Sequence, residues 1–321
     1  MYEDFFGLDS NPFRLSPDPD CFFRSAIHAK ALAYLRYGIM QHEGFIVITG
    51  EIGSGKTVLI RNVIKQIDHE RHLVAFIPPA ILKDEDVIRA VAVAFDVYEH
   101  GLGKVDLALR LQRLFADLVW HDRTAILVID EAQTLSREAI EELMVLANVM
   151  VNDVPVLQVI LVGQALLKAR LSGIEMEQIR QRVVAYFHLT PLMAEEVCQY
   201  IDFRMRRHGW NGQKLFTSEV SMLIYAETSG LPRRINRMCD RILLNCFLQG
   251  KKEVTAVEVV EVIGELKGEM IFDPEEQLGD KEDPLLERVS VMEGRVRSME
   301  KVNTLVVRML RKMVDRNKIS A

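Results

Sequence analysis

Short apolar runs alternate with longer helical patterns between about residues 44 and 190. The runs are rich in Val, Ile, Leu and Phe, which is typical of strands that are covered on both faces. Strands that alternate with helices in this way indicate a parallel sheet wrapped by crossover helices. Five strands are predicted, at residues 45–49, 74–77, 125–129, 156–162 and 185–189.

The strand pattern stops after Pro191, and amphipathic helical patterns follow as far as about residue 268. Breaks that contain Gly or Pro, at residues 209–212 and 230–232, divide this stretch into three or four helices. We therefore predict an α/β domain at residues 1–190 and a small helical domain at residues 191–268.

Two segments of different character complete the chain. Residues 269–284 carry seven acidic side chains, one lysine, two prolines and a glycine, and this composition indicates a flexible linker. From residue 285 on, apolar residues recur with spacings of four and three over four heptads, which predicts a coiled coil at residues 285–317.

The coiled-coil frame places one asparagine, Asn303, at an a position in mid-seam, which is typical of parallel dimers. The apolar face widens toward the C-terminus, where the e and g positions are Val or Met. This half therefore favours a further helix, a partner protein or a docking surface on the chain's own α/β domain. A lone amphipathic helix packed on the helical domain is the simpler alternative.

Composition narrows the class of protein. The 321 residues are 49% hydrophobic and 27% charged, as in a soluble globular chain. No stretch approaches the roughly 18–20 consecutive apolar residues that a membrane span needs, and the nearest is the ten-residue run at 154–163. The N-terminus lacks the pattern of a secretory signal. We expect a cytoplasmic protein with no transmembrane segment, either free or peripheral to the inner membrane.

Cysteines and net charge disfavour two kinds of site. The four cysteines have no C-x-x-C spacing, so buried reduced thiols are expected rather than a cysteine metal site. The net charge of −6 provides no basic field that would attract nucleic acid.

The strongest chemical motif follows the first predicted strand and opens a helical pattern. It matches the phosphate-binding loop G-x-x-x-x-G-K-[ST], in which backbone N–H groups and a lysine hold the phosphates of ATP and a hydroxyl ligates Mg²⁺. Its residues, with the one that follows, are Gly50, Glu51, Ile52, Gly53, Ser54, Gly55, Lys56, Thr57 and Val58. The sequence therefore predicts ATP and Mg²⁺ as ligands.

Two adjacent carboxylates follow the third predicted strand. Asp130 fits a role toward Mg²⁺, together with Thr57, and Glu131 fits the base that activates the attacking water. Gln164 follows the fourth predicted strand, where its side chain is expected to reach the water or the γ-phosphate, although a helix cap is the alternative. These positions predict an ATPase.

With these residues in hand, the chain resembles the AAA+ ATPases of the ExeA or general-secretion-protein-A type. The resemblance is strongest to the subfamily found beside exosortase A and exopolysaccharide genes, and it spans residues 1 to about 267. Its motifs are Asn11-Pro12-Phe13, Pro17-Asp18-Pro19, Tyr37-Gly38, residues 44–51, Asp130-Glu131-Ala132-Gln133, Gly163-Gln164, Arg180-Gln181-Arg182, Gly209-Trp210 and Pro232-Arg233-Arg234-Ile235-Asn236.

The resemblance implies the AAA+ strand order, a helical lid at residues 191–268, and a homo-oligomer, as a ring or another assembly, in which a neighbour completes each site. Arg180 and Arg182 stand where proteins similar to the RuvB motor place the arginine finger, and Arg233 resembles the lid arginine called sensor 2. Arg180 and Arg182 are two positions apart, so on a helix only one of them would point at the neighbour. Without the resemblance, Arg233 would be one member of a solvated basic stripe on a helix.

The expected function is Mg²⁺-dependent ATP hydrolysis that energises or regulates an envelope process, such as exopolysaccharide or protein export. An unidentified envelope or secretion protein is the expected partner of the coiled coil. Longer members of the family continue into a membrane span and a cell-wall-binding domain, which the acidic linker and coiled coil replace here. The alternatives are a DNA-binding assembly factor, similar to transposition regulators, and an ATP-gated scaffold with little turnover.

Overall fold

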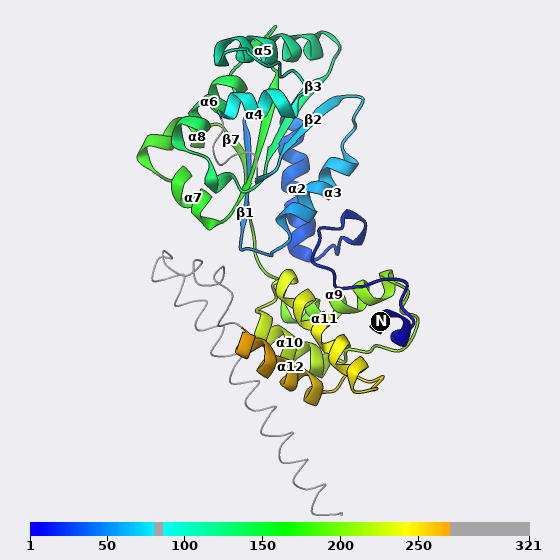
Figure 1. The fold of residues 1–321 in the computed structure, drawn as a ribbon. Helices are drawn as coiled ribbons and strands as arrows, with labels where there is room; N and C mark the ends of the chain where they lie inside the picture. Colours follow the sequence, from blue (N-terminus) through cyan, green and yellow to red (C-terminus); the bar gives the residue numbers. More distant parts are fainter. Residues whose placement is uncertain (80–85, 270–321) are drawn as a thin grey trace, which may run out of the picture. The chain divides into compact units, whose positions relative to one another are not determined.

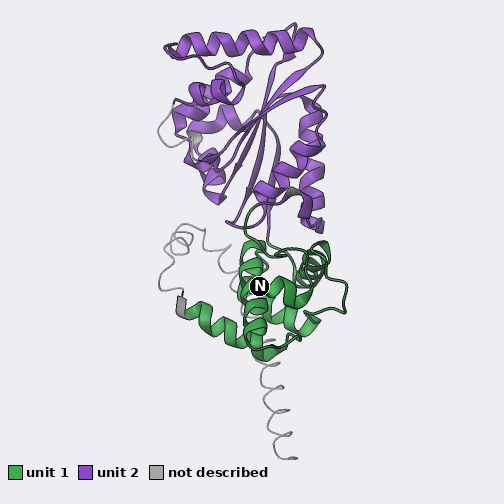
Figure 2. Cartoon of the chain, turned by 45° about the vertical axis from the view of Figure 1, so that its right-hand side comes forward, with its two compact units in different colours: residues 1–16, 191–321 green, residues 17–190 purple. Residues whose placement is uncertain are grey.

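The computed structural model of the chain describes residues 1–79 and 86–269. The chain divides into two compact units, which Figure 2 shows in different colours. One unit is Pro17–Thr190, and the other joins Met1–Ser16 to the residues from Pro191 onward. The predicted coiled coil and the predicted linker beyond Glu269 lie outside the described residues.

A five-stranded parallel sheet forms the centre of the α/β unit, in the order β2-β3-β6-β1-β7. All five predicted strands are confirmed, and the sheet with its flanking helices confirms the predicted fold class. The strands are β1 (Phe45–Gly50), β2 (His72–Ile77), β3 (Thr124–Ile129), β6 (Leu157–Gly163) and β7 (Val183–Leu189).

Helices cover both faces of this sheet (Figure 1). Along the chain, η1 and α2 precede β1, and the other helices and short 3-10 helices connect the later strands. Their bounds are η1 (Pro19–Cys21), α2 (Ala26–Gln41), α3 (Lys56–Gln66), α4 (Val87–Ala94), α5 (Lys104–Trp120), η3 (Ala132–Thr134), α6 (Arg137–Ala147), α7 (Ala165–Leu171), η4 (Ile174–Met176) and α8 (Glu177–Arg180).

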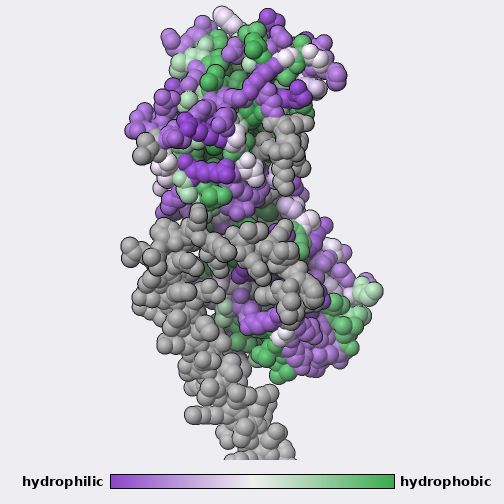
Figure 3. Space-filling model, turned by 60° about the vertical axis from the view of Figure 1, so that its left-hand side comes forward, coloured by the Kyte–Doolittle hydropathy of each residue, from purple (hydrophilic) through white to green (hydrophobic). Residues whose placement is uncertain are grey.

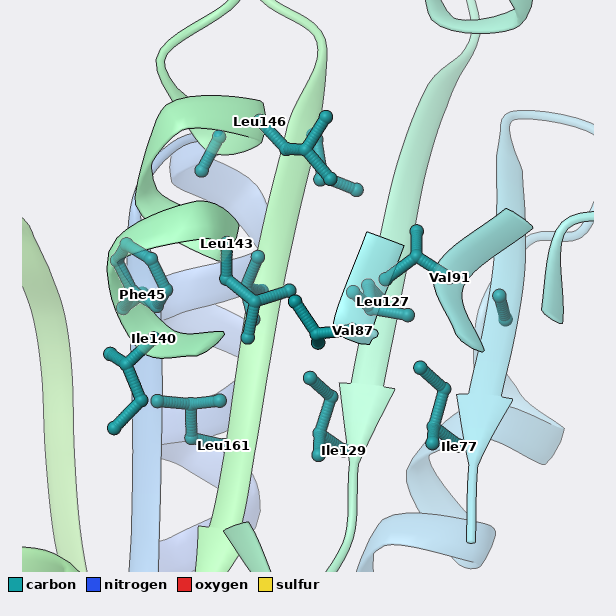
Figure 4. Close-up of a cluster of buried hydrophobic side chains, with 14 of the residues drawn as sticks. Phe45, Ile77, Val87, Val91, Leu127, Ile129, Ile140, Leu143, Leu146 and Leu161 are labelled. Carbon is teal, nitrogen blue, oxygen red and sulfur yellow. The ribbon is translucent and has the colours of Figure 1, made fainter. Parts of the chain in front are cut away.

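Alternate residues of the strands build two separate apolar cores, because side chains of a strand point to opposite faces in turn. Phe45 and Val47 of β1 enter the core beneath α4 to α8, whereas Ile46 and Ile48 enter the core beneath α2 and α3. Figure 4 shows Phe45 in the first of these cores, with residues of α4 and α6 packed over the strands. The central strands β1, β3 and β6 are buried along almost their whole length, whereas the edge strands β2 and β7 are only partly buried, so the apolar runs in the sequence reflect burial most directly in the centre of the sheet.

A small hairpin that the sequence pattern did not predict precedes β6. It consists of β4 (Met150–Val151) and β5 (Val154–Pro155), which pair in antiparallel fashion. Asn152 and Asp153 form the turn with φ of 52° and 61°, the left-handed region that such two-residue turns require. Strands of two residues are too short to give a period-2 signal.

The helical unit contains α1 and the four longer helices that follow the sheet, as predicted for the region after Pro191. Their bounds are α1 (Tyr2–Phe6), α9 (Ala194–Arg207), α10 (Ser218–Thr228), α11 (Pro232–Leu248) and α12 (Ala256–Glu269). Thr217 caps the N-terminus of α10, and Pro232 occupies the first turn of α11, where its missing N–H costs nothing. Both features agree with the helix breaks read from the sequence.

The first 16 residues belong to the helical unit, not to the α/β domain in which the sequence analysis placed them. Tyr2 and Asn11 both donate hydrogen bonds to Asp240 of α11, at 2.5 and 2.9 Å. The buried Arg204 of α9 donates to the carbonyl oxygen of Pro12 at 2.6 Å. These contacts join residues about 190 or more positions apart, so no local pattern announces them.

Phe13 anchors the same segment. Its side chain is 1% exposed and its ring meets Phe216 edge-on, with 6.0 Å between centroids. Asn11 Oδ1 accepts a hydrogen bond from the backbone N–H of Phe13 and so fixes the turn before the ring. The Asn11-Pro12-Phe13 motif is thus part of the core of the helical unit.

Large apolar side chains remain exposed on several helices. On α5, Val105 is 72% and Trp120 71% exposed, and Figure 3 shows apolar and polar surface interspersed on one face of the molecule. Among the described residues, no helix combines the length and the apolar character needed to cross a membrane.

We expect Phe13→Ala to lower the free energy of unfolding of the helical unit by about 3–5 kcal/mol, because it leaves a cavity in a closed core. Chemical denaturation followed by circular dichroism measures this. Leu15→Ala is the matched control, since Leu15 lies in the same segment and is 54% exposed. Equal losses from both substitutions would show that the segment is not anchored through Phe13.

Candidate nucleotide site

The phosphate loop connects the end of β1 to the start of α3. Gly53 and Gly55 have φ of 81° and 99°, which L side chains rarely adopt, and α3 begins directly after them at Lys56. A Cβ on Gly50 would lie 2.7 Å from the carbonyl oxygen of Leu189 on β7. The glycines of the motif are therefore required by backbone conformation and by the closeness of the neighbouring strand.

Lys56 is buried within this loop, with 5% of its surface exposed. Its ammonium group donates hydrogen bonds to the carbonyl oxygens of Gly50 at 2.9 Å and Glu51 at 2.8 Å. Burial lowers the pKa of Lys56, whereas the nearby carboxylates of Glu131 and Asp130 act in the opposite direction. The loop thus holds a desolvated cation at the N-terminus of α3, where phosphate oxygens are favoured.

Thr57 and Asp130 bring two hard oxygen donors together. The Thr57 hydroxyl donates a hydrogen bond of 2.8 Å to Asp130 Oδ2, although the residues are 73 positions apart. Asp130 is 4% exposed and follows β3, next to β6 in the sheet. Hydroxyl and carboxylate oxygens are the ligands that Mg²⁺ prefers, so this pair fits the metal role expected from the sequence.

Glu131 turns the chain sharply after β3. Its φ of 53° is unusual for a residue with a side chain. The turn is held because Asp130 Oδ1 accepts from the backbone N–H of Glu131 at 2.9 Å, and Thr134 donates its hydroxyl to the Glu131 carbonyl oxygen at 2.9 Å. The strained backbone thus fixes the position of the Glu131 Cβ atom, from which the carboxylate extends.

Two glutamine amides hold the Glu131 carboxylate. Gln164, at the end of β6, donates from Nε2 to Glu131 Oε2 at 3.0 Å. Gln133 of η3 donates to the same oxygen and accepts the backbone N–H of Gln164 at 3.0 Å. Gln164 also stands directly before α7, but its side chain makes no capping hydrogen bond to that helix, so the helix-cap alternative raised from the sequence is wrong. No role was predicted for Gln133, although it lies in the Asp-Glu-Ala-Gln motif.

The remaining loop residues line the outside of the site. Glu51 and Ile52 are exposed, with Ile52 at 45%, and Val58 is half-buried on α3. The sequence analysis also predicted no role for His28 of α2, which is 5% exposed. A hydrogen bond of 2.7 Å joins its Nδ1 to the Ser25 hydroxyl. His28 Nε2 lies 3.1 Å from where a Cβ on Gly55 would stand, so the ring lies close to the loop at this glycine.

The residues present fit a nucleotide phosphate and Mg²⁺. The glycines let the loop close tightly on itself, since a Cβ on Gly50 would lie only 2.9 Å from Ser54 Oγ. The Ser54 hydroxyl oxygen is buried and has no hydrogen-bond partner in the described part of the chain, and such a group is stabilised by an added polar ligand. Within that same part, no cluster of three His, Cys, Asp or Glu side chains is arranged for a metal.

The three arginines proposed from the resemblance have different surroundings. Arg180, the last residue of α8, donates to the carbonyl oxygens of Ser172 at 2.7 Å and Gly173 at 2.8 Å, just past the end of α7. Arg182 is exposed, and its side chain has no hydrogen bond or ion pair among the described residues. Arg233 is exposed at the second position of α11 in the helical unit.

Comparisons with known proteins agree with this geometry. Residues 39–171 match the family described as AAA domain. The chain is 34% identical over 270 residues to General secretion pathway protein A of Aeromonas hydrophila. The matched region covers 84% of this chain and 49% of that protein. The chain therefore spans about half the length of this curated relative.

Solved structures share the fold. The chain is similar to the ADP form of ORC2 from Aeropyrum pernix, with a TM-score of 0.61, 17% identity, and coverage of 80% of this chain and 72% of that one. It is also similar to Cdc6p from Pyrobaculum aerophilum, with a TM-score of 0.55, 16% identity, and coverage of 81% and 70%. From the sheet order, the phosphate loop and these matches together, we conclude that the chain has the P-loop AAA+ fold.

Proposed function

We propose that the chain hydrolyses ATP with Mg²⁺ as cofactor, in an oligomer whose neighbouring subunit completes each site. The observation that carries the proposal is the Glu131 carboxylate, held by two amides beside the Thr57–Asp130 pair at the carboxyl end of the sheet. A buried lysine, two hard oxygens and a positioned base are the parts that phosphoryl transfer to water requires.

The roles follow from position. Backbone N–H groups between Gly50 and Gly55 hold the phosphates, and Lys56 neutralises the charge of the outer ones. Thr57 and Asp130 would hold Mg²⁺, which would supply positive charge to offset that of the phosphates. Gln164 orients the attacking water together with Glu131.

We assign Glu131 as the base because hydrogen bonds hold one of its carboxylate oxygens and leave the other available to accept a proton. Oε2 accepts both amides, whereas Oε1 has no donor among the described residues. Oε1 takes a proton from the attacking water as the water oxygen bonds to the γ-phosphorus. The bond from the γ-phosphorus to the bridging oxygen breaks, and its electron pair leaves with ADP, so the products are ADP and inorganic phosphate.

Of the two candidate finger residues, we assign the role to Arg182. Arg180 is committed to the carbonyls beyond α7, whereas the Arg182 guanidinium is free among the described residues. Arg182 precedes β7 at the amino end of the sheet, and the phosphate loop is at the carboxyl end. Strands of six or seven residues separate these ends by about 20 Å, beyond the reach of an arginine. Arg182 therefore serves a neighbour's γ-phosphate and not its own.

Arg233 is the proposed sensor of the γ-phosphate on the lid. It follows Pro232 in the first turn of α11 and is exposed. A planar, permanently charged group in this place reports loss of the phosphate as a movement of the lid.

We propose that the ATPase serves an envelope process, either protein export or exopolysaccharide export of the exosortase-associated kind. Its support is the similarity to General secretion pathway protein A over 84% of this chain. We propose in addition that residues 285–317 pair with another copy or with an envelope partner, and that the ATPase acts in the cytoplasm beside the inner membrane. The likeness to ORC2 and Cdc6p shows the fold alone and gives the DNA-binding alternative no added weight.

We expect Lys56→Ala to abolish nucleotide binding, because it removes the charge that faces the phosphates, and Glu131→Gln to keep ATP bound while turnover falls at least 100-fold. Binding of a fluorescent ATP analogue and phosphate release measure the two effects. Lys65→Ala on the same helix, with its lysine 60% exposed, is the control for loss of a positive charge. Parental turnover in Glu131→Gln would refute the assignment of the base.

Arg182→Ala is expected to bind ATP and to lose 10³-fold or more of its turnover, the order that such fingers contribute. Arg180→Ala is the matched control and should mainly lower thermal stability. Mixing inactive Arg182→Ala subunits with inactive Lys56→Ala subunits should restore part of the activity, since each intact site then has an intact neighbouring arginine. No recovery at any ratio would contradict a shared site.

A further inference from the structure

Gln133 is the least expected group at the site. It lies in η3, two residues beyond Glu131, and only 8% of its surface is exposed. A surface turn residue would be solvated, whereas this amide is buried between the end of β6 and the Glu131 carboxylate. A polar side chain is stable in such a buried position only when its hydrogen bonds are satisfied.

The two ends of the amide have different partners, and these partners fix its orientation. The backbone N–H of Gln164 can only donate, so it requires the carbonyl oxygen of Gln133, at 3.0 Å. An ionised carboxylate can only accept, so Glu131 Oε2 requires the NH₂ group of Gln133. The opposite orientation would place two acceptors together and two donors together. Gln133 therefore has one stable arrangement.

The backbone of β6 makes room for this amide. A Cβ on Gly163 would lie 2.8 Å from Gln133 Oε1, so only glycine at that position leaves the oxygen space. The Gly163–Gln164 end of the strand thus receives Gln133 through a glycine and a backbone N–H. The pairing is built into both elements and is not a chance contact of a long side chain.

We propose that Gln133 is a positioning residue for hydrolysis: it locks the Glu131 carboxylate to the end of β6, so that Oε1 is presented to the attacking water. The inference rests on the proposed role of Glu131 as the base. Gln133 itself touches neither nucleotide nor water in this assignment. It sets the orientation of Glu131 and, through the Gln164 N–H, the distance between Glu131 and Gln164.

A structural role and a positioning role differ in their kinetic effects. Loss of orientation at the base lowers kcat and leaves nucleotide binding intact, since the base contributes in the transition state. A carboxylate at position 133 would keep the acceptor for the Gln164 N–H but place a second negative charge beside Glu131. Two adjacent carboxylates hold a shared proton more tightly than one carboxylate alone. The acidic limb of the pH profile would then move to higher pH.

The test uses the full chain at a concentration where the parent is active. Gln133→Leu should lower kcat about 10- to 100-fold with the affinity for a fluorescent ATP analogue within about twofold of the parent. Gln133→Glu should shift the acidic limb of the kcat profile upward by about one pH unit or more. Thermal melting checks that each variant is folded.

Gln158→Leu is the matched control. Gln158 is likewise a buried glutamine, 2% exposed, but it stands near the start of β6 and donates to the carbonyl oxygens of Gly38 and Glu43. Its loss should reduce stability and leave the pH profile in place. The comparison separates the cost of removing a buried amide from the cost of releasing Glu131.

Glu131→Gln, measured in parallel, separates the two proposals. If that variant is inactive while Gln133→Leu turns over at the parental rate and Gln133→Glu shows the parental pH profile, the inference about Gln133 fails and the proposed function stands. If Glu131→Gln keeps parental turnover, both fail. Equal losses of kcat in Gln133→Leu and Gln158→Leu, with no shift of the profile in Gln133→Glu, would also overturn the positioning role.

Discussion

The parallel register of β1 with its two neighbours is the constraint on which the nucleotide site depends. Thr49 pairs with Gly163 on one side and with His188 on the other, so three strands end at the same edge of the sheet. Parallel strands with crossover helices bring their carboxyl ends together in this way, and ligands of open α/β sheets bind there. The phosphate loop and Gln164 meet because this register holds, and the parallel pairing of β3 with β6 brings Glu131 to the same edge.

Burial of charge is the cost of this arrangement. Lys56 and Asp130 are both at or below 5% exposure, and an isolated charge at such depth is strongly unfavourable. The structure offsets the cost with directed hydrogen bonds, from Lys56 to two loop carbonyls and from Thr57 to Asp130. These groups are therefore arranged before a nucleotide arrives, and little reorganisation is needed when it does.

In the helical unit, a small number of long-range contacts hold the N-terminal segment in place. Its N-terminal segment lies against α9 and α11 through Arg204, Asp240 and the ring of Phe13. The chain consequently enters the helical unit first, passes through the whole α/β unit, and returns at Pro191. The two units are therefore joined by two covalent connections, after Ser16 and after Thr190, and a movement of one unit relative to the other must be accommodated at both.

The sequence by itself determined the features that depend on near neighbours. Fully buried strands read as apolar runs, and the phosphate loop is a contiguous motif because its backbone wraps one ligand, so the fold class and the positions of Lys56, Thr57, Asp130 and Glu131 were evident. The tertiary structure alone decided which arginine is bound to the end of α7, where residues 1–16 pack, and that Gln133 joins Glu131 to β6. These contacts join segments far apart in the chain or depend on how a side chain turns, and hydrophobic periodicity records neither.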